Sequence, residues 1–401
     1  MNAERLNALA RTLKKEIAAT NYPALIAQLA DQLSAVAREP MQPAHQQNAN
    51  GLREQLETAL RESPTNSYSP AWRQTLSELG VANLVGNGLL AQVNAVYARS
   101  AVTPATAAEA MAPLAELVRR LDVAVDGLIG GFDFFEIGAE ELDPGEFEIG
   151  FLIPRVEVDD DLEGLGREFQ ALWRILAPFV EITTGSRPDM KVRSISSSEF
   201  QVFLHALPET AALVAVTVER LIAAWSNIMS IRVAYAQLEQ ANVSEERLKQ
   251  IAEEADERMG AEIDVIVGDV LKRVKATDGR VNELRTEMTR SLSELADRID
   301  RGYNVQVEVG ELPEAQEDDS KETTAELAKL RKWRDAVLAA QPQLAFMNET
   351  GKPILHLAQH AEAAPSSDDG KPDTDAARPT PRRRTRKPAA TEAAEEGKEG
   401  S

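Results

Sequence analysis

The segment PETAALVAVTVERLIAAWSNIMSIRVAYAQLEQ, Pro208–Gln240, opens a nearly unbroken helical pattern that continues to Gly302. Its apolar residues recur at intervals of three, four or seven, which places them on one face of a helix. This stripe consists of Val214, Val218, Leu221, Trp225, Ile228 and Tyr235, and it is widened by Leu213, Ile222 and Met229. Because a wide apolar stripe must be buried, we expect this helix to lie half-buried in a core.

Two interruptions divide the pattern into three helices. A turn is expected near Asn242–Ser244, and Thr277–Gly279 breaks or kinks the pattern a second time. The third helix ends in a cationic last turn followed by Gly302, a glycine stop. Directly after it, Tyr303–Val309 alternates apolar with polar residues, which predicts a half-buried strand.

Two further stretches with strand character precede the long helices. Phe147–Arg155, FEIGFLIPR, is a compact apolar run closed by proline, which predicts a buried strand. Met190–Leu204 predicts a second strand region that folds into a hairpin at Ser196–Ser198. Over Glu146–Val309 these elements predict an α+β fold that is predominantly α-helical, with a small β-sheet packed against long amphipathic helices.

Composition divides the chain into four regions. Residues 1–129 form a helical N-terminal region, and residues 130–310 form the α+β core with the long helices. Residues 311–361 comprise a linker and the amphipathic helix Thr323–Ala340, which is expected to fold back or to pair with a partner. Residues 362–401 lack aromatic residues, so a disordered C-terminal tail with one basic segment is predicted.

The overall charge and the absence of cysteine restrict the function classes. The 401 residues include 65 acidic and 44 basic ones, a net charge of −21, which disfavours broad contact with nucleic acid or anionic lipid. No cysteine is present, which excludes disulfides and thiolate metal sites and is compatible with the cytoplasm. The most apolar run, Ala211–Val218, is far shorter than the roughly 20 residues of a membrane span, so no transmembrane segment and no membrane partner are expected.

Three blocks within the core carry a resemblance to other sequences. They are FEIGFLIPR (Phe147–Arg155), ISSSEFQVFL (Ile195–Leu204) and GRVNELR (Gly279–Arg285), the last followed by DRIDRGYNVQV (Asp297–Val307). In these blocks the chain resembles an uncharacterised bacterial protein family. The resemblance covers roughly Glu146–Val309. It implies no activity, because no reaction, ligand or site is assigned to that family.

No combination of residues has the spacing of a catalytic or metal site. The acidic run Asp159–Asp161 at a strand-to-helix junction favours helix capping over a cation site. His356 and His360 share a helical spacing but have no third ligand nearby, and His205 is expected to be a packed core histidine. We therefore expect no catalytic residue, no metal and no cofactor, and we favour a protein that is not an enzyme.

Four residues near the strand ends form a candidate anion contact. Arg155 follows the first strand, and Arg193 lies beside the serines of the predicted hairpin, so guanidinium groups and hydroxyls can converge on an anion. The candidate contacts are Arg155, Arg193, Ser196 and Ser197. The alternative, which we favour, is solvated ion pairing with the neighbouring carboxylates of Glu157, Asp159 or Glu199.

The tail carries a second candidate, the basic segment RPTPRRRTRK at Arg378–Lys387. It can contact the phosphates of DNA, RNA or an anionic membrane, with Arg382, Arg383, Arg384, Arg386 and Lys387 as the contacting residues. The alternative is attraction to the acidic residues that follow in the tail, Glu392, Glu395 and Glu396. Because the rest of the chain is acidic, nucleic acid is expected only through this tail.

The leading functional prediction is a non-enzymatic cytoplasmic scaffold or interaction protein that self-associates through its long helices. It depends on the length of the amphipathic stripes and on the lack of a catalytic set. The expected partner is a second copy of the chain or another protein. One alternative is an effector or regulator in bacterial stress or antiviral defence that senses an anionic ligand; the other is tail-mediated binding of nucleic acid.

Overall fold

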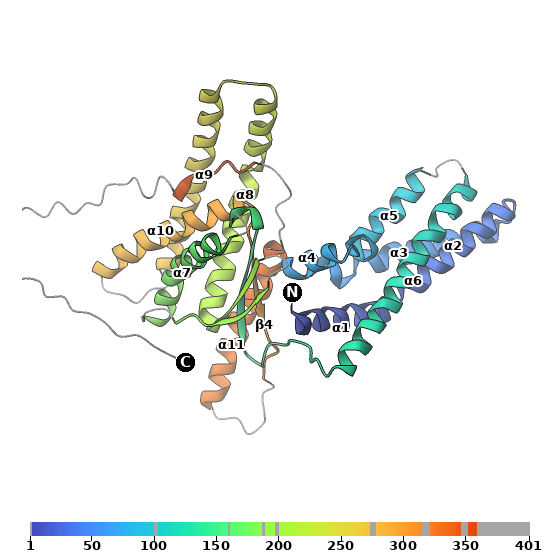
Figure 1. The fold of residues 1–401 in the computed structure, drawn as a ribbon, viewed down its shortest axis with the longest axis horizontal. Helices are drawn as coiled ribbons and strands as arrows, with labels where there is room; N and C mark the ends of the chain where they lie inside the picture. The colour runs from blue at the N-terminus through green and yellow to red at the C-terminus, as the bar shows by residue number, and fades with distance from the viewer. Residues whose placement is uncertain are drawn as a thin grey trace, which may run out of the picture. The chain divides into compact units, whose positions relative to one another are not determined.

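The computed structural model describes residues 2–99, 103–158, 161–186, 189–196, 200–272, 278–313, 321–345 and 352–358 (Figure 1). The chain divides into two units, Met1–Glu362 and Ala363–Ser401. The predicted disordered tail with its basic segment lies outside the described residues, and so do His360, Asp159, Asp160 and the predicted linker residues 315–320.

The N-terminal region is built from helices around their own core. Its helices are α1 (Ala3–Thr20), α2 (Tyr22–Arg38), α3 (Pro43–Arg61), α4 (Pro70–Glu78), α5 (Gly86–Arg99) and α6 (Pro104–Phe134), with short 3₁₀ turns at Pro64–Ser67 and Ala82–Leu84. Proline stands in the first turn of α2, α3, α4 and α6, where its missing N–H has no intrahelical partner to lose. Apolar residues such as Ile26, Leu56 and Met111 form a continuous buried cluster.

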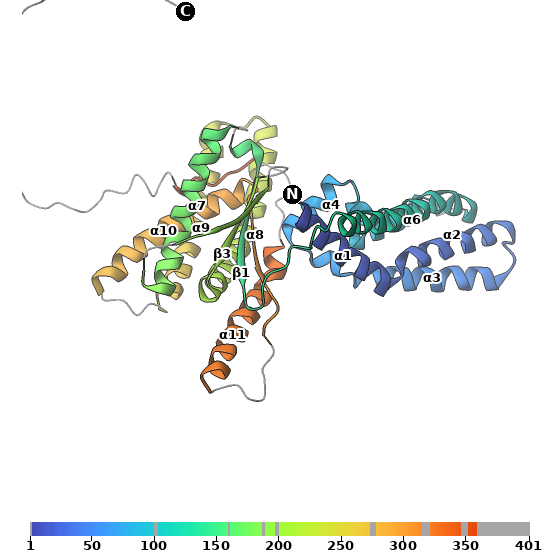
Figure 2. The same ribbon diagram turned by 60° about the horizontal axis from the view of Figure 1, so that its bottom comes forward.

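Four antiparallel strands form the sheet (Figure 2). They are β1 (Phe147–Ile153), β2 (Val192–Ser196), β3 (Phe200–Ala206) and β4 (Asn304–Val309), in the spatial order β2-β3-β1-β4. The predicted buried strand is β1, and the predicted hairpin is β2 paired with β3. The prediction of a small sheet is therefore confirmed.

Long helices pack on one face of this sheet, either directly or on one another, and complete the predicted α+β, predominantly helical fold. They are α7 (Leu162–Thr184), α8 (Pro208–Gln240), α9 (Glu245–Leu271), α10 (Asp278–Asp300) and α11 (Lys321–Leu344). Asp161 caps α7, as predicted, because its carboxylate accepts a hydrogen bond from the Gly164 amide at 2.5 Å. Helices α8 and α9 form a hairpin whose turn contains Asn242 at φ 53°, a left-handed conformation that Asn tolerates. Helix α11 folds back on α8 and β4.

The opposite face of the sheet is also covered, which corrects the prediction of a half-buried strand at Tyr303–Val309. Gln306 on β4 is only 3% exposed and Glu148 on β1 only 2%. The amide of Ala71, at the start of α4, donates to Gln306 Oε1 at 3.2 Å, and Ala71 packs with Leu152 and Phe203. A period-two pattern reports only that one face is apolar, so it cannot show that a polar face is covered as well.

A short segment near the end of the described chain is buried against α8, α9 and α10. We call residues 352–358 the C-terminal strap; its Ile354, Leu355 and Leu357 belong to the main core. Asp300 accepts hydrogen bonds from the amides of Ile354 and Leu355 at 2.6 and 2.9 Å. Asp297 accepts from the two amides at the end of the strap, and Asp256 accepts from that of His356.

Within the described residues, α8 alone has the length and hydropathy of a candidate membrane span. However, 61% of its apolar window is buried inside the protein. Core helices of soluble proteins have the same properties, so a soluble protein is compatible with this finding.

Candidate functional site

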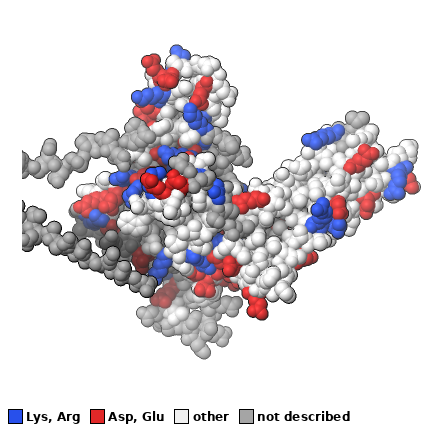
Figure 3. All heavy atoms as spheres, viewed as in Figure 1, with Lys and Arg blue, Asp and Glu red and all other residues white. Residues whose placement is uncertain are grey.

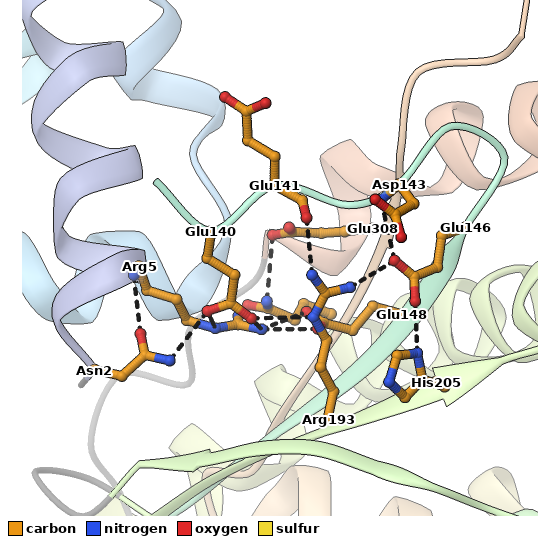
Figure 4. Close-up of polar contacts among 11 residues, drawn as sticks. Asn2, Arg5, Glu140, Glu141, Asp143, Glu146, Glu148, Arg193, His205 and Glu308 are labelled. Carbon is orange, nitrogen blue, oxygen red and sulfur yellow. Dashed lines mark hydrogen bonds and ion pairs between the residues drawn. The ribbon is translucent and has the colours of Figure 1, made fainter. Parts of the chain in front are cut away.

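Arg193, one of the predicted anion contacts, is fully engaged with acidic groups. Its Nη1 donates to Glu146 Oε2 at 2.8 Å and its Nε to Glu140 Oε1 at 3.1 Å, while Nη2 donates to the carbonyl of Glu141 at 2.8 Å (Figure 4). Each donor nitrogen of the guanidinium therefore already has an oxygen partner. This arrangement is the ion pairing that we favoured, although its carboxylates are not the ones that we expected.

The second predicted arginine lies elsewhere along the sheet. Arg155 follows the end of β1 that pairs with Phe200, and its guanidinium lies 4.9 Å from the centroid of the Phe200 ring. Arg193 lies beside Leu204, four residues further along β3, which is about 13 Å at the rise of a strand. The structure therefore does not bring the two arginines together on one ligand.

The remaining predicted contacts add no anion site. Ser196 is the last residue of β2, opposite Gln201, and it is buried. Ser197 lies outside the described residues, and so do Arg382, Arg383, Arg384, Arg386 and Lys387 of the tail.

Arg193 belongs to a larger group, which we call the back-face cluster. Its members are Arg5, Glu140, Glu146, Glu148, Arg193, His205 and Glu308 (Figure 4). Arg5, from α1, donates to Glu148 Oε2 at 2.7 Å and stacks over the Phe203 ring at 3.3 Å from its centroid. These contacts join the first helix of the chain to the covered face of the sheet.

His205 also departs from its prediction. It was expected to be a packed core histidine, but its side chain is 43% exposed and its Nδ1 lies 2.6 Å from Glu146 Oε1. The reason is strand parity, because His205 lies opposite Glu148 in the pairing of β3 with β1 and points to the same polar face.

Carboxylates outnumber guanidinium groups in the back-face cluster, with Glu140, Glu146, Glu148 and Glu308 against Arg5 and Arg193. Burial raises the pKa of Glu148 to about 7, with Arg5 acting in the opposite direction. Burial also raises the pKa of Glu308. The cluster is therefore suited to hold protons or cations and unsuited to receive an anion.

Sequence reasoning missed the back-face cluster because its members come from five separate segments. The signal present in the sequence was a charged residue, Glu148, inside the strand FEIGFLIPR. A buried carboxylate needs partners, yet the pattern does not say which residues supply them. Among the described residues, no group of three or more His, Cys, Asp or Glu side chains is arranged to hold a metal ion.

A second candidate site is a surface without charge on the longest helix. Beyond Leu221, the exposed residues of α8 follow one another at intervals of one, three or four and are all uncharged. We call them the α8 neutral face: Ala223, Ser226, Asn227, Ser230, Val233, Gln237 and Gln240. By contrast, most exposed positions of α9 are charged, and Figure 3 shows this difference between the two arms of the hairpin.

A helix face in water is normally charged, so the α8 neutral face calls for an explanation. Its signal was present in the sequence, because Arg232 and Glu239 are the only charged residues from Leu221 to Gln240. Arg232 is buried and donates to Asp300, and Glu239 pairs with Lys352. Neither charge therefore interrupts the face.

No protein family, curated protein or solved structure matches the chain. The family resemblance of the three sequence blocks stays a prediction.

Proposed function

We propose that this protein is a non-enzymatic, cytoplasmic scaffold or interaction protein that self-associates through the α8 neutral face. The observation that supports the proposal is the run of uncharged exposed residues from Ala223 to Gln240 in a chain that is 27% charged. Depletion of charge is a compositional mark of the centre of protein interfaces. The lack of cysteine fits the reducing cytoplasm.

The composition of the face suits a second copy of the same helix. Ala223, Ser226 and Ser230 are small enough to let two helix backbones approach closely. Asn227 and Gln237 carry side-chain amides that can donate and accept hydrogen bonds at once. The amides of one copy can therefore form hydrogen bonds with those of a second copy across a twofold axis. The face extends over about 26 Å of helix, which is long enough for an antiparallel pair.

Light scattering coupled to size-exclusion chromatography on the full chain tests this proposal. We expect an oligomer, in the simplest case with twice the chain mass of 43.8 kDa. Ser230→Glu places a carboxylate near the middle of the face and, in a twofold pair, close to its own copy. The expected result is a monomer, because two like charges and their desolvation oppose association.

A matched control is Gln250→Glu on α9, which adds the same charge to an exposed position of the other arm. This variant should keep the mass of the wild type, and the circular dichroism of both variants should be unchanged. A wild-type protein that stays monomeric up to millimolar concentration contradicts the proposal. So does an oligomer that Ser230→Glu leaves intact.

The basic segment RPTPRRRTRK favours a second candidate function, binding of nucleic acid through the tail. It has five arginines and one lysine within ten residues, against a net charge of −21 for the chain. Retention on a DNA column at low salt should fall when residues 370–401 are removed. Equal retention with and without these residues contradicts it.

We do not propose an anion sensor at Arg155 and Arg193, because the donors of Arg193 are occupied by Glu140, Glu141 and Glu146.

A further inference from the structure

A cavity of about 260 Å³ lies at the edge of the sheet beside β4. Its walls come from the turn before α4, from β4 itself and from the end of α11. Tyr68 and Trp72 line one side and Leu338 and Leu344 another. We call it the β4 cavity. Nothing in the proposed self-association uses it, because the α8 neutral face contributes no lining residue.

Among the described residues that line the β4 cavity, Glu308 carries the only charged side chain. Its Oε1 accepts a hydrogen bond from Gln306 Nε2 at 3.2 Å, and Gln306 accepts in turn from the amide of Ala71 at 3.2 Å. This chain of hydrogen bonds fixes the carboxylate relative to the start of α4. Within the described part of the chain, no ammonium or guanidinium group forms an ion pair with Glu308.

The aromatic wall of the cavity is held in place by a separate set of bonds. The rings of Tyr68 and Trp72 meet edge to face, with centroids 5.0 Å apart and planes at 84°. The hydroxyl of Tyr68 donates to Glu16 Oε2 at 3.1 Å, and Glu16 also accepts from the amide of Thr65 at 3.1 Å. The wall is therefore formed before any ligand arrives, which reduces the entropy lost on binding.

The charges around Glu308 provide an independent indication of the ligand. The two guanidinium groups of the back-face cluster, Arg5 from α1 and Arg193 from β2, already pair with Glu140 and Glu148. Glu308 thus adds a further negative charge beside Glu148, and each of the two carboxylates opposes ionisation of the other. A bound cation offsets this excess of negative charge. Protons compete with the cation for the carboxylates.

We propose that the β4 cavity binds a small organic cation of the ammonium class. The ammonium group lies against the carboxylate of Glu308, and its alkyl groups lie against the ring of Trp72 and the side chains of Leu338 and Leu344. An aromatic ring beside a carboxylate is the chemical combination that recognises alkylated ammonium groups. The cavity volume of about 260 Å³ accommodates a ligand of the size of tetramethylammonium.

Isothermal titration calorimetry of the full chain with tetramethylammonium chloride tests the proposal at pH 8. tert-Butanol is the matched neutral probe, because it has a similar shape without the charge, and sodium chloride controls for ionic strength. We expect heat of binding with tetramethylammonium alone. Trp72→Ala should weaken binding by about tenfold, since the ring attracts the cation.

Glu308→Gln should weaken binding by at least about tenfold, and Glu311→Gln, an exposed glutamate three residues further on, should leave it unchanged. Glu308 is only partly buried and glutamine has nearly the same shape, so the Glu308→Gln protein should keep its melting temperature or raise it. Wild-type affinity should be weaker at pH 6 than at pH 8, because protons then compete for Glu148 and Glu308.

Three results overturn the proposal. The first is equal binding of tert-butanol, which makes the cavity merely apolar. The second is an affinity that Glu308→Gln does not change, and the third is no binding of tetramethylammonium up to high millimolar concentration at pH 8. None of these results depends on the oligomeric state. The self-association proposal is tested independently, by the Ser230→Glu variant.

Discussion

At the scale of single residues, Glu148 makes the stability of the sheet depend on pH. Its pKa is raised by burial to about 7 in the folded protein, against 4.5 for the free side chain. Below pH 4.5 the carboxyl is protonated in both states. As the pH rises from 4.5 to 7, the folded state keeps a proton that the unfolded state releases, so this stabilising contribution is lost, at most about 3 kcal/mol.

Glu148→Gln removes this loss, because glutamine does not ionise. We expect the difference in unfolding free energy, variant minus wild type, to increase between pH 5 and pH 8 in urea titrations. Glu141→Gln is the control, since the exposed side chain of Glu141 takes no part in the cluster and only its carbonyl accepts from Arg193. A difference that is the same at pH 5 and pH 8 contradicts the raised pKa.

The burial of the Glu148 side chain could not be predicted from the sequence. FEIGFLIPR correctly predicted a buried strand, since its apolar residues Phe147, Ile149 and Phe151 face the helices. The cover on the opposite face comes from Arg5 and Ala71, which lie 143 and 77 positions earlier in the chain than Glu148. Periodicity reports the local face of an element and has no information about a partner so distant in sequence.

At the scale of elements, Asp300 on α10 joins the C-terminal strap to α8. Asp300 accepts four hydrogen bonds, from the amides of Ile354 and Leu355 and from the side chains of Trp225 and Arg232. Asp300→Ala leaves buried donors without partners, which should lower the unfolding free energy by about 3–5 kcal/mol in urea titrations. The strap should then become accessible to proteases.

An exposed aspartate on α9, Asp264, serves as the matched control, and Asp264→Ala should change stability by less than about 0.5 kcal/mol. If Asp300→Ala is equally mild, the strap is not held by these bonds. The strap was not predicted from sequence. The segment KPILHLA is too short to show a period, and Asp297 and Asp300 occupy positions that look like a solvated helix end.

At the scale of the whole molecule, the chain contains two large hydrophobic cores. One lies among α1–α6 and the other between the sheet and α7–α11. Among the described residues, the buried apolar group shared between them is small, namely Ala71, Leu152 and Phe203, and beside it lie the polar contacts of Arg5 with Glu148 and of Ala71 with Gln306. Because little apolar surface is shared, we expect the two cores to unfold in two separate transitions in scanning calorimetry.

Substitutions in each core separate the two transitions. Leu56→Ala removes a fully buried side chain among the N-terminal helices, and Ile175→Ala does the same on α7. Each should cost about 2–5 kcal/mol and lower the midpoint of its own transition while leaving the other in place. The α8 neutral face lies on a helix of the second core, so the Leu56→Ala protein should keep the oligomeric mass even when its N-terminal core has melted. A single transition that both substitutions lower equally means that the polar junction at Arg5 and Glu148 couples the cores into one cooperative unit.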